Sequence, residues 1–356
     1  MLSIAYQYTD TLVEITSTGA GLRLGRPLHE KNQVRMRKRI LSRFSPLGVA
    51  AVLLGGWVGK AQNGEITHPA ASTPPGKFVD VTAASGVHFQ GQAYHTAKKY
   101  LIETMGSGVA LLDYDNDGRL DIFFANGAVL TDPTAPGTIP QKSGPKDWNR
   151  LYHQKDDGTF EDVTEKAGLA GAGYDMGVAV GDYDNDGYED LYVTGYGGNH
   201  LYHNNGAGKF ADVTEASGTG GSGWSTSAAW VDLDNDGRLD LVVLRYLKWD
   251  FSDLFCGEHR EGYRAYCHPD LFPPIAPLVY HNDGNGHFTE VAAKIGLDHP
   301  GKGLGIAIAD YDRDGHTDIF VANDSMQEFL YHNKGNGTFE EDGAASLQFF
   351  KEMLAT

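Results

Sequence analysis

Apolar residues in the central and C-terminal parts of the chain occur in short runs bounded by glycine and aspartate. GVALLDY, for example, precedes a polar stretch that begins at Asp113, and LDIFFAN follows it. Short runs of Val, Ile, Leu, Phe and Tyr between turn-forming residues are typical of β-strands. The pattern therefore predicts pairs of strands, each pair joined by a polar hairpin loop.

The polar stretch, DYDNDGRLD, has Asp at positions 1, 3, 5 and 9 and glycine at position 6. The same spacing returns as DYDNDGYED, DLDNDGRLD and DYDRDGHTD, which start at residues 182, 232 and 310. Four carboxylates in one tight turn repel each other unless a cation lies among them, and Ca²⁺ takes six to eight oxygen ligands. We therefore expect about four Ca²⁺ ions, with the ligands Asp113, Asp115, Asp117, Asp121, Asp182, Asp184, Asp186, Asp190, Asp232, Asp234, Asp236, Asp240, Asp310, Asp312, Asp314 and Asp318.

These loops differ from EF-hand loops. An EF-hand has a bidentate Glu at position 12 and a helix on each side. Position 12 is apolar in all four loops, and the flanks have the composition of strands. The alternative is a set of acidic turns without metal, because Asp, Asn and Gly also form ordinary turns.

Two further motifs alternate with the Asp loops. One is G-x-F-x-D/E-V-T, as in GKFVDVT at residue 76 and GTFEDVT at residue 158. The other is LYHN, as in HLYHN at residue 200 and FLYHN at residue 329. Each cycle contains four short strands, which is the content of one β-propeller blade. The sequence therefore predicts an all-β propeller with four recognisable four-stranded blades over residues 77–342.

Two segments interrupt the repeat. The first, residues 126–148, is rich in Pro, Gly and Thr, and the second, residues 245–277, contains Cys256 and Cys267. Two isolated cysteines in an exported chain favour a disulfide over a metal or redox site. The alternative is a pair of reduced thiols.

The N-terminal region has the features of an export signal. Residues 1–35 show no clear pattern, and we interpret them as an unstructured or mis-annotated upstream extension. Residues 36–61 have a basic start and an apolar run too short for a membrane span, which predicts a signal peptide. A signal anchor or a buried helix is the alternative. Residues 62–76 are interpreted as a linker.

These features predict an exported protein located in the periplasm, at the cell surface or outside the cell, without a membrane span in the mature chain. The chain has 356 residues, 46 of them Gly, and a net charge of −18. Such acidity argues against a nucleic-acid partner, because phosphate backbones repel it. Bound Ca²⁺ would offset part of the charge.

Four equivalent histidines lie in the LYHN strands. One per blade keeps them apart, so we expect no shared metal site and interpret them as packing between blades, together with the tyrosines that precede them. The residues are His153, His203, His281, His332, Tyr152, Tyr202, Tyr280 and Tyr331. Three glutamates in or near the inserted segments, Glu103, Glu258 and Glu261, are interpreted as solvated surface near a binding face.

The motifs resemble the FG-GAP/VCBS repeats of integrin-alpha-type propellers. GKFVDVTAASGVHF, KKYLIETMGSGVALLDYDNDGRLDIFFANG and CGEHREGYRAYCHPD more closely resemble bacterial exported proteins of the cartilage-acidic-protein-like (ASPIC/UnbV-associated) group. The resemblance covers about residues 76–342 and implies calcium in each Asp loop. The fourth loop departs at position 4, where Arg313 replaces Asn. We expect this loop still to bind.

The resemblance also implies a ring of about seven blades and a C-terminal ASPIC/UnbV domain. This chain has four blades, and the repeat pattern ends in an aberrant tail, residues 343–356. We therefore expect an incomplete seven-bladed ring, truncated at its C-terminal end, whose open faces favour self-association. A closed four-bladed ring is the alternative.

No sequence motif for a known catalytic centre is recognised: GxSxG, HExxH and a Walker loop are missing, and no dinucleotide fingerprint with its flanking strand and helix is found. We therefore expect a non-enzymatic module that binds an extracytoplasmic protein or glycan. The alternative is a polysaccharide lyase or hydrolase that uses the two inserted segments.

Overall fold

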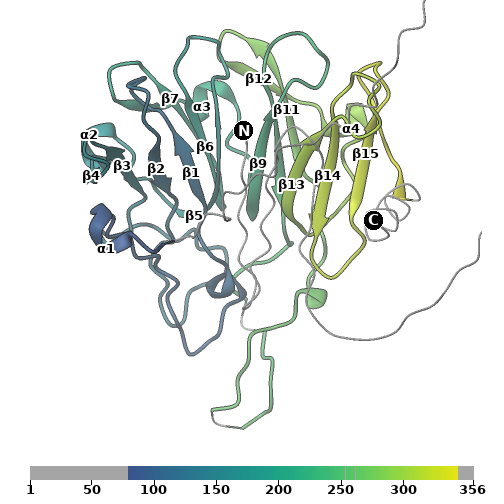
Figure 1. Cartoon of the computed structure of the whole chain (residues 1–356). Coiled ribbons are helices and arrows are strands. Elements are labelled where there is room, and N and C mark those ends of the chain that lie inside the picture. The colour runs from purple at the N-terminus through teal and green to yellow at the C-terminus, as the bar shows by residue number, and fades with distance from the viewer. Residues whose placement is uncertain (1–78, 253, 261, 344–356) are drawn as a thin grey trace, which may run out of the picture. The chain divides into compact units, whose positions relative to one another are not determined.

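The computed structural model describes residues 79–252, 254–260 and 262–343. These residues form four antiparallel sheets of four strands each, arranged in chain order (Figure 1). The expected extension, signal peptide and linker, and all of the tail after Gly343, lie outside the described residues. The prediction of four four-stranded blades is confirmed.

Each repeat unit folds into one sheet, and its strands are neighbours in sequence order. The first sheet comprises β1 (Val109–Leu112), β2 (Asp121–Phe124), β3 (Arg150–Gln154) and β4 (Phe160–Asp162). The second comprises β5 (Tyr174–Gly181), β6 (Asp190–Tyr196), β7 (His200–Asn204) and β8 (Phe210–Asp212). The third comprises β9 (Ser225–Val231), β10 (Asp240–Arg245), β11 (Leu278–Gly284) and β12 (His287–Glu290). The fourth comprises β13 (Gly303–Ala309), β14 (Asp318–Asn323), β15 (Phe329–Asn333) and β16 (Phe339–Glu341).

Short helical turns lie outside the strands, and three of them connect successive sheets. The α-helices are α1 (Thr82–Ser85), α2 (Thr164–Ala167), α3 (Thr214–Ser217) and α4 (Ala292–Ile295), and the 3₁₀ turns are η1 (Leu101–Thr104) and η2 (Pro269–Leu271). Each α-helix ends at a glycine with positive φ. After α4, a Cβ on Gly296 would lie 2.6 Å from the carbonyl oxygen of Phe339, so only glycine lets the turn dock on the outer strand of the next sheet.

Apolar side chains fill the space between neighbouring sheets. Leu112 and Phe123 of the first sheet, for instance, share one buried cluster with Leu191 and Val193 of the second. The predicted packing role of the tyrosines is confirmed for the three that join such clusters between two sheets, namely Tyr202, Tyr280 and Tyr331.

A repeated hydrogen bond adds to this packing. An asparagine at or near the end of the third strand donates its side-chain amide to the backbone carbonyl of the second loop residue in the preceding sheet. The bonds are Asn204 to Tyr114 at 2.8 Å, Asn282 to Tyr183 at 2.8 Å, and Asn333 to Leu233 at 3.0 Å. The first sheet follows no described sheet and has Gln154 at this position.

The four sheets do not form a closed ring in the described part of the chain (Figure 1). The fourth sheet contains its own outer strand, β16. Val109 and Leu111 of the first sheet are 54% and 58% exposed, whereas Val178 and Val180 at the same positions of the second sheet pack against the first. Self-association through this open face remains a prediction.

The two inserted segments lie at the end of the sheets opposite the Asp loops, because they connect the second and third strands of their units (Figure 1). Aromatic residues cluster there, including Tyr100, Tyr196, Trp224 and Phe251. The sheets therefore present two different ends, one formed by the Asp loops and one by the inserted segments.

A buried ion pair fixes the first insertion to the second sheet. Lys142 Nζ lies 3.3 Å from Asp175, and both side chains are almost fully buried. Lys142 also donates to the carbonyl oxygens of Asn126 at 2.6 Å and Gly127 at 3.1 Å. Burial lowers the pKa of Lys142 and raises the pKa of Asp175.

We expect Lys142→Met to lower the free energy of unfolding by about 3–5 kcal/mol, because it leaves the Asp175 carboxylate buried without its cation. Urea denaturation monitored by fluorescence measures this loss. The double variant Lys142→Met/Asp175→Leu removes both charges and should be more stable than the single variant. A double variant less stable than Lys142→Met would contradict a role for the charge pair.

Candidate metal centres

The Asp loop of the first sheet is held by backbone hydrogen bonds to its own carboxylates. Asp113 accepts from the amides of Asp117 at 2.9 Å and Gly118 at 2.8 Å, and Asp117 accepts from Arg119 at 2.9 Å. The same three bonds recur in the other loops. The carboxylates are thus turned toward the inside of each loop.

The fourth loop keeps this geometry despite its different residue at position 4. That position has a left-handed backbone in every loop, with φ between 56° and 66° at Asn116, Asn185, Asn235 and Arg313. Asn adopts this conformation more readily than Arg. The backbone of the fourth loop is therefore the same with Arg313 as with Asn, and metal binding by this loop stays a prediction.

The aspartate at position 9 is buried and begins the second strand of each sheet. Asp121 is fully buried and accepts hydrogen bonds from the backbone amides of Gln154 at 2.7 Å and Tyr114 at 3.2 Å. Its counterparts, Asp190, Asp240 and Asp318, have exposed fractions of 0% to 1%. The third strand therefore fixes one carboxylate of the loop in place.

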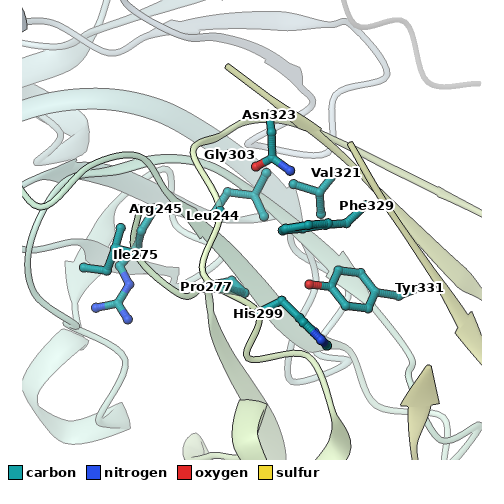
Figure 2. A pocket seen from close by; sticks show the side chains of 11 residues that line it. Leu244, Arg245, Ile275, Pro277, His299, Gly303, Val321, Asn323, Phe329 and Tyr331 are labelled. Carbon is teal, nitrogen blue, oxygen red and sulfur yellow. The ribbon is translucent and has the colours of Figure 1, made fainter. Parts of the chain in front are cut away.

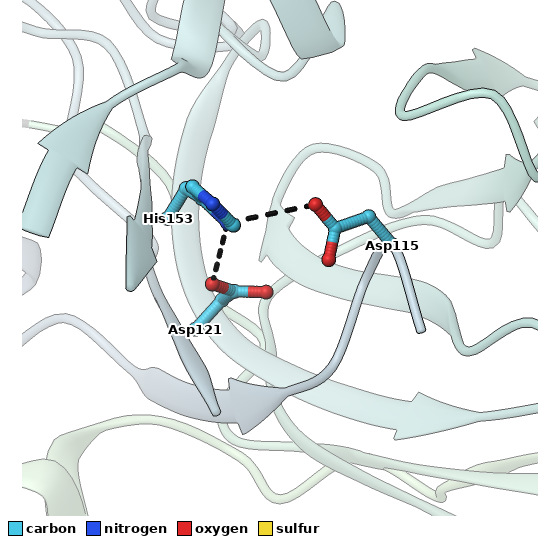
Figure 3. A group of neighbouring side chains, drawn as sticks. All are labelled: Asp115, Asp121 and His153. Carbon is cyan, nitrogen blue, oxygen red and sulfur yellow. Dashed lines mark hydrogen bonds and ion pairs between the residues drawn. The ribbon is translucent and has the colours of Figure 1, made fainter. Parts of the chain in front are cut away.

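The structure corrects the interpretation of the LYHN histidines. They do not serve mainly as packing between sheets, because each ring lies beside the carboxylates of its own loop. His153 Nδ1 is 3.2 Å from Asp121 and 3.6 Å from Asp115 (Figure 3). His203, His281 and His332 repeat the arrangement, with Nδ1 3.2, 3.1 and 3.4 Å from the ninth aspartate.

Strand register explains why this was missed. Ile122 of β2 pairs with Tyr152 of β3, which places Asp121 opposite His153. Directly opposed residues of antiparallel strands have neighbouring side chains. The sequence motifs identify the two strands but do not give their register.

Burial and neighbouring negative charges make the ionised forms of several loop carboxylates less stable. Burial raises the pKa of Asp121 and Asp240, and it raises the pKa of Asp190 to about 7. Burial also raises the pKa of Asp184, with a contribution from neighbouring Asp186. A bound cation would oppose these shifts, because an opposite charge favours the ionised carboxylate.

The donor atoms of the loops fit a divalent cation. In each sheet the third and ninth aspartates and the histidine offer ligand atoms that lie within 4.8 Å of one another. Asp115 Oδ1 is buried and makes no hydrogen bond in the described structure. An oxygen-rich set of this kind suits a hard dication such as Ca²⁺.

At the opposite end, Glu103 is not solvated surface, which corrects its interpretation. Its side chain is 3% exposed and accepts hydrogen bonds from the backbone amides of Thr96 and Tyr100, both at 3.1 Å, and from the Tyr266 hydroxyl at 3.0 Å. Four donors, counting the Thr96 hydroxyl at 2.5 Å, satisfy the buried carboxylate. Glu103 is thus a structural anchor.

This anchor brings together two stretches that the sequence keeps far apart, ETMGSG and CGEHREGYRAYCHPD. Arg264 Nε donates to the carbonyl oxygen of Lys98 at 2.6 Å, and a disulfide joins Cys256 to Cys267. The predicted disulfide is confirmed in the structure. Glu258 is exposed as expected, and Glu261 lies outside the described residues.

A small cleft lies between the third and fourth sheets (Figure 2). Leu244, Pro277, His299 and Phe329 line it, and the buried Tyr331 hydroxyl, which has no hydrogen-bond partner among the described residues, points into it. Its cavity volume is about 10 Å³, which is room for about one water molecule. This cleft therefore does not suit an oligosaccharide.

We expect Glu103→Gln to lower the free energy of unfolding by about 2–3 kcal/mol, because the new amide group cannot accept from all the donors around it. It should also speed proteolytic cleavage between Cys256 and Cys267. The matched control Tyr266→Phe removes one hydrogen bond and should cost about 1 kcal/mol. If the Gln variant melts and is cleaved like the unmodified protein, the anchoring role is wrong.

No helix among the described residues has the length and apolar character that a membrane crossing requires.

Cartilage acidic protein 1 from Mus musculus is 27% identical over 225 residues, which are 63% of this chain and 32% of the relative. The Homo sapiens protein of the same name is 42% identical over 55 residues, or 15% of this chain and 8% of that protein. The chain thus matches about a third or less of the length of these relatives.

A solved structure of an Agrocybe aegerita lectin, described as recognising non-reducing terminal N-acetylglucosamine, aligns with a TM-score of 0.34 and 17% identity. The alignment covers 67% of this chain and 51% of the lectin, and at this TM-score it does not bear on the fold or the ligand. The profile of the FG-GAP-like repeat matches residues 113–193, 182–243, 253–321 and 310–350. Because these matches span more than half of the sequence, the chain belongs to the FG-GAP-like repeat family.

Proposed function

We propose that this protein is an exported binding module in which Ca²⁺ ions in the four Asp loops stabilise the sheets. The observation that carries the proposal is the loop geometry, in which backbone amides orient the carboxylates inward in four equivalent places. Family membership supports a binding or adhesion role. The calcium is structural, since each loop supplies most of its own ligands.

The partner, an extracytoplasmic protein or glycan, binds at the end of the sheets that carries the inserted segments. Loops supported by a rigid scaffold are where binding surfaces usually occur. This end is anchored by Glu103, by the Lys142–Asp175 pair and by the disulfide. Tyr263 and Leu254, 48% and 45% exposed, present apolar surface there.

Chelation should lower the melting temperature. With about 1 mM Ca²⁺ and a Kd near 0.1 mM, each independent site contributes roughly 1.4 kcal/mol to the free energy of unfolding. Asp234→Ala should remove about one site's contribution, whereas Asp298→Ala, at an exposed aspartate outside the loops, should have little effect. Differential scanning fluorimetry with Ca²⁺ and with excess EGTA measures both. Identical melting curves under the two conditions would contradict a structural role for Ca²⁺.

The binding role can be separated from an enzymatic one with a single protein preparation. A glycan array and a polysaccharide-degradation assay, run with Ca²⁺ present, should give binding without turnover. A protein partner can be detected by cross-linking to extracytoplasmic proteins. Because we place its binding site on the inserted segments, Tyr263→Ser should reduce the amount of cross-linked product, whereas Asp298→Ala should not. Release of unsaturated or reducing sugar products would refute the non-enzymatic role.

A further inference from the structure

Each Asp loop has a histidine beside it that the calcium proposal does not use. We propose that the LYHN histidines are metal ligands, so that each loop is a mixed oxygen–nitrogen site that accepts a first-row transition dication such as Mn²⁺ as well as Ca²⁺. This inference rests on the proposed metal-binding role of the loops. It concerns His153, His203, His281 and His332.

The distances between the ring nitrogens and the carboxylate oxygens are slightly longer than those of ligands that share one ion. Neighbouring ligands of an octahedral dication with bonds of about 2.0–2.2 Å lie about 2.8–3.1 Å apart. His153 Nδ1 lies 3.2 Å from Asp121 and 3.6 Å from Asp115. In the second sheet, His203 Nδ1 lies 3.2 and 3.5 Å from the equivalent oxygens of Asp190 and Asp184. Small rotations of the carboxylates would close the remaining gap around an ion.

The other two sheets repeat this arrangement. His281 Nδ1 lies 3.1 Å from Asp240 and 3.9 Å from Asp234, and His332 Nδ1 lies 3.4 Å from both of its carboxylates. In all four sheets the same ring nitrogen faces the third and the ninth aspartate of the loop. The arrangement is therefore a repeated feature of the loops.

The ring orientation is set by packing in three of the four sheets. The aromatic residue at loop position 2 meets the imidazole edge to face, with centroid distances of 5.8 Å for Tyr114 and His153, 6.0 Å for Tyr183 and His203, and 6.1 Å for Tyr311 and His332. In the fourth sheet His332 Nδ1 makes no hydrogen bond among the described residues, but it faces the carboxylates of Asp312 and Asp318 at 3.4 Å. An ion placed between these groups could be bound by all three.

The ligand chemistry decides which metals fit. Ca²⁺ takes oxygen ligands, whereas an imidazole nitrogen favours transition dications. The loop aspartates together with one imidazole make a donor set suited to octahedral Mn²⁺. The competing role for the histidine is that of a hydrogen-bond donor that orients the ninth aspartate without touching the metal.

The full chain is loaded with Mn²⁺ and studied by electron paramagnetic resonance. Binding should saturate near four ions, and pulsed spectra should contain the ¹⁴N coupling of a directly bound imidazole. Each substitution His153→Asn, His203→Asn, His281→Asn or His332→Asn should reduce this signal by about a quarter and weaken Mn²⁺ binding at that site at least about 10-fold. Ca²⁺ affinity should change less than about threefold.

Asparagine is the informative replacement, because its side-chain amide can donate a hydrogen bond from the position of Nδ1. If the histidines only orient aspartates, the Asn variants will keep the Mn²⁺ affinity and the unmodified protein will lack the ¹⁴N coupling, which overturns the proposal. Circular dichroism and melting of each variant establish that it is folded. Ca²⁺ binding without Mn²⁺ binding refutes this inference alone, whereas loss of both refutes the proposed function as well.

Discussion

The crowding of carboxylates in each Asp loop is the constraint on which the rest of this structure depends. The ninth aspartate starts the second strand, accepts a backbone amide of the third strand and lies beside the histidine of that strand. The first Asp loop also contacts the next sheet, because the backbone amide of Asp113 donates to the Glu189 carboxylate at 2.8 Å. A cation bound in the loop would therefore stabilise the hairpin, the sheet and the contact with the next sheet together.

The stacking of sheets follows from a small number of repeated contacts. Apolar clusters join each pair of neighbours, and an asparagine at or near the end of the third strand donates to the loop of the preceding sheet. Each sheet packs against its neighbours along the chain, as in other repeat proteins. The free face of the first sheet, with Val109 and Leu111 exposed, is the surface that such an arrangement leaves uncovered.

The repeated motifs were sufficient to predict the four sheets, their strand content and the place of the loops. Local spacing determines these features, because each motif lies within a few residues of the element that it forms. The partners of His153 depend on strand register, and the burial of Glu103 depends on Tyr266, which is 163 residues away. Neither contact has a local sequence signal, so both were misinterpreted from the sequence. The disulfide was predictable because the chain contains two cysteines only.

The central claim is that the four Asp loops hold divalent cations. Equilibrium dialysis of the full chain against Ca²⁺, followed by elemental analysis of metal and protein, tests it most directly. The account predicts about four Ca²⁺ ions per chain at saturation and about three after Asp234→Ala. A saturated value below one ion per chain, in protein shown to be folded, would contradict it.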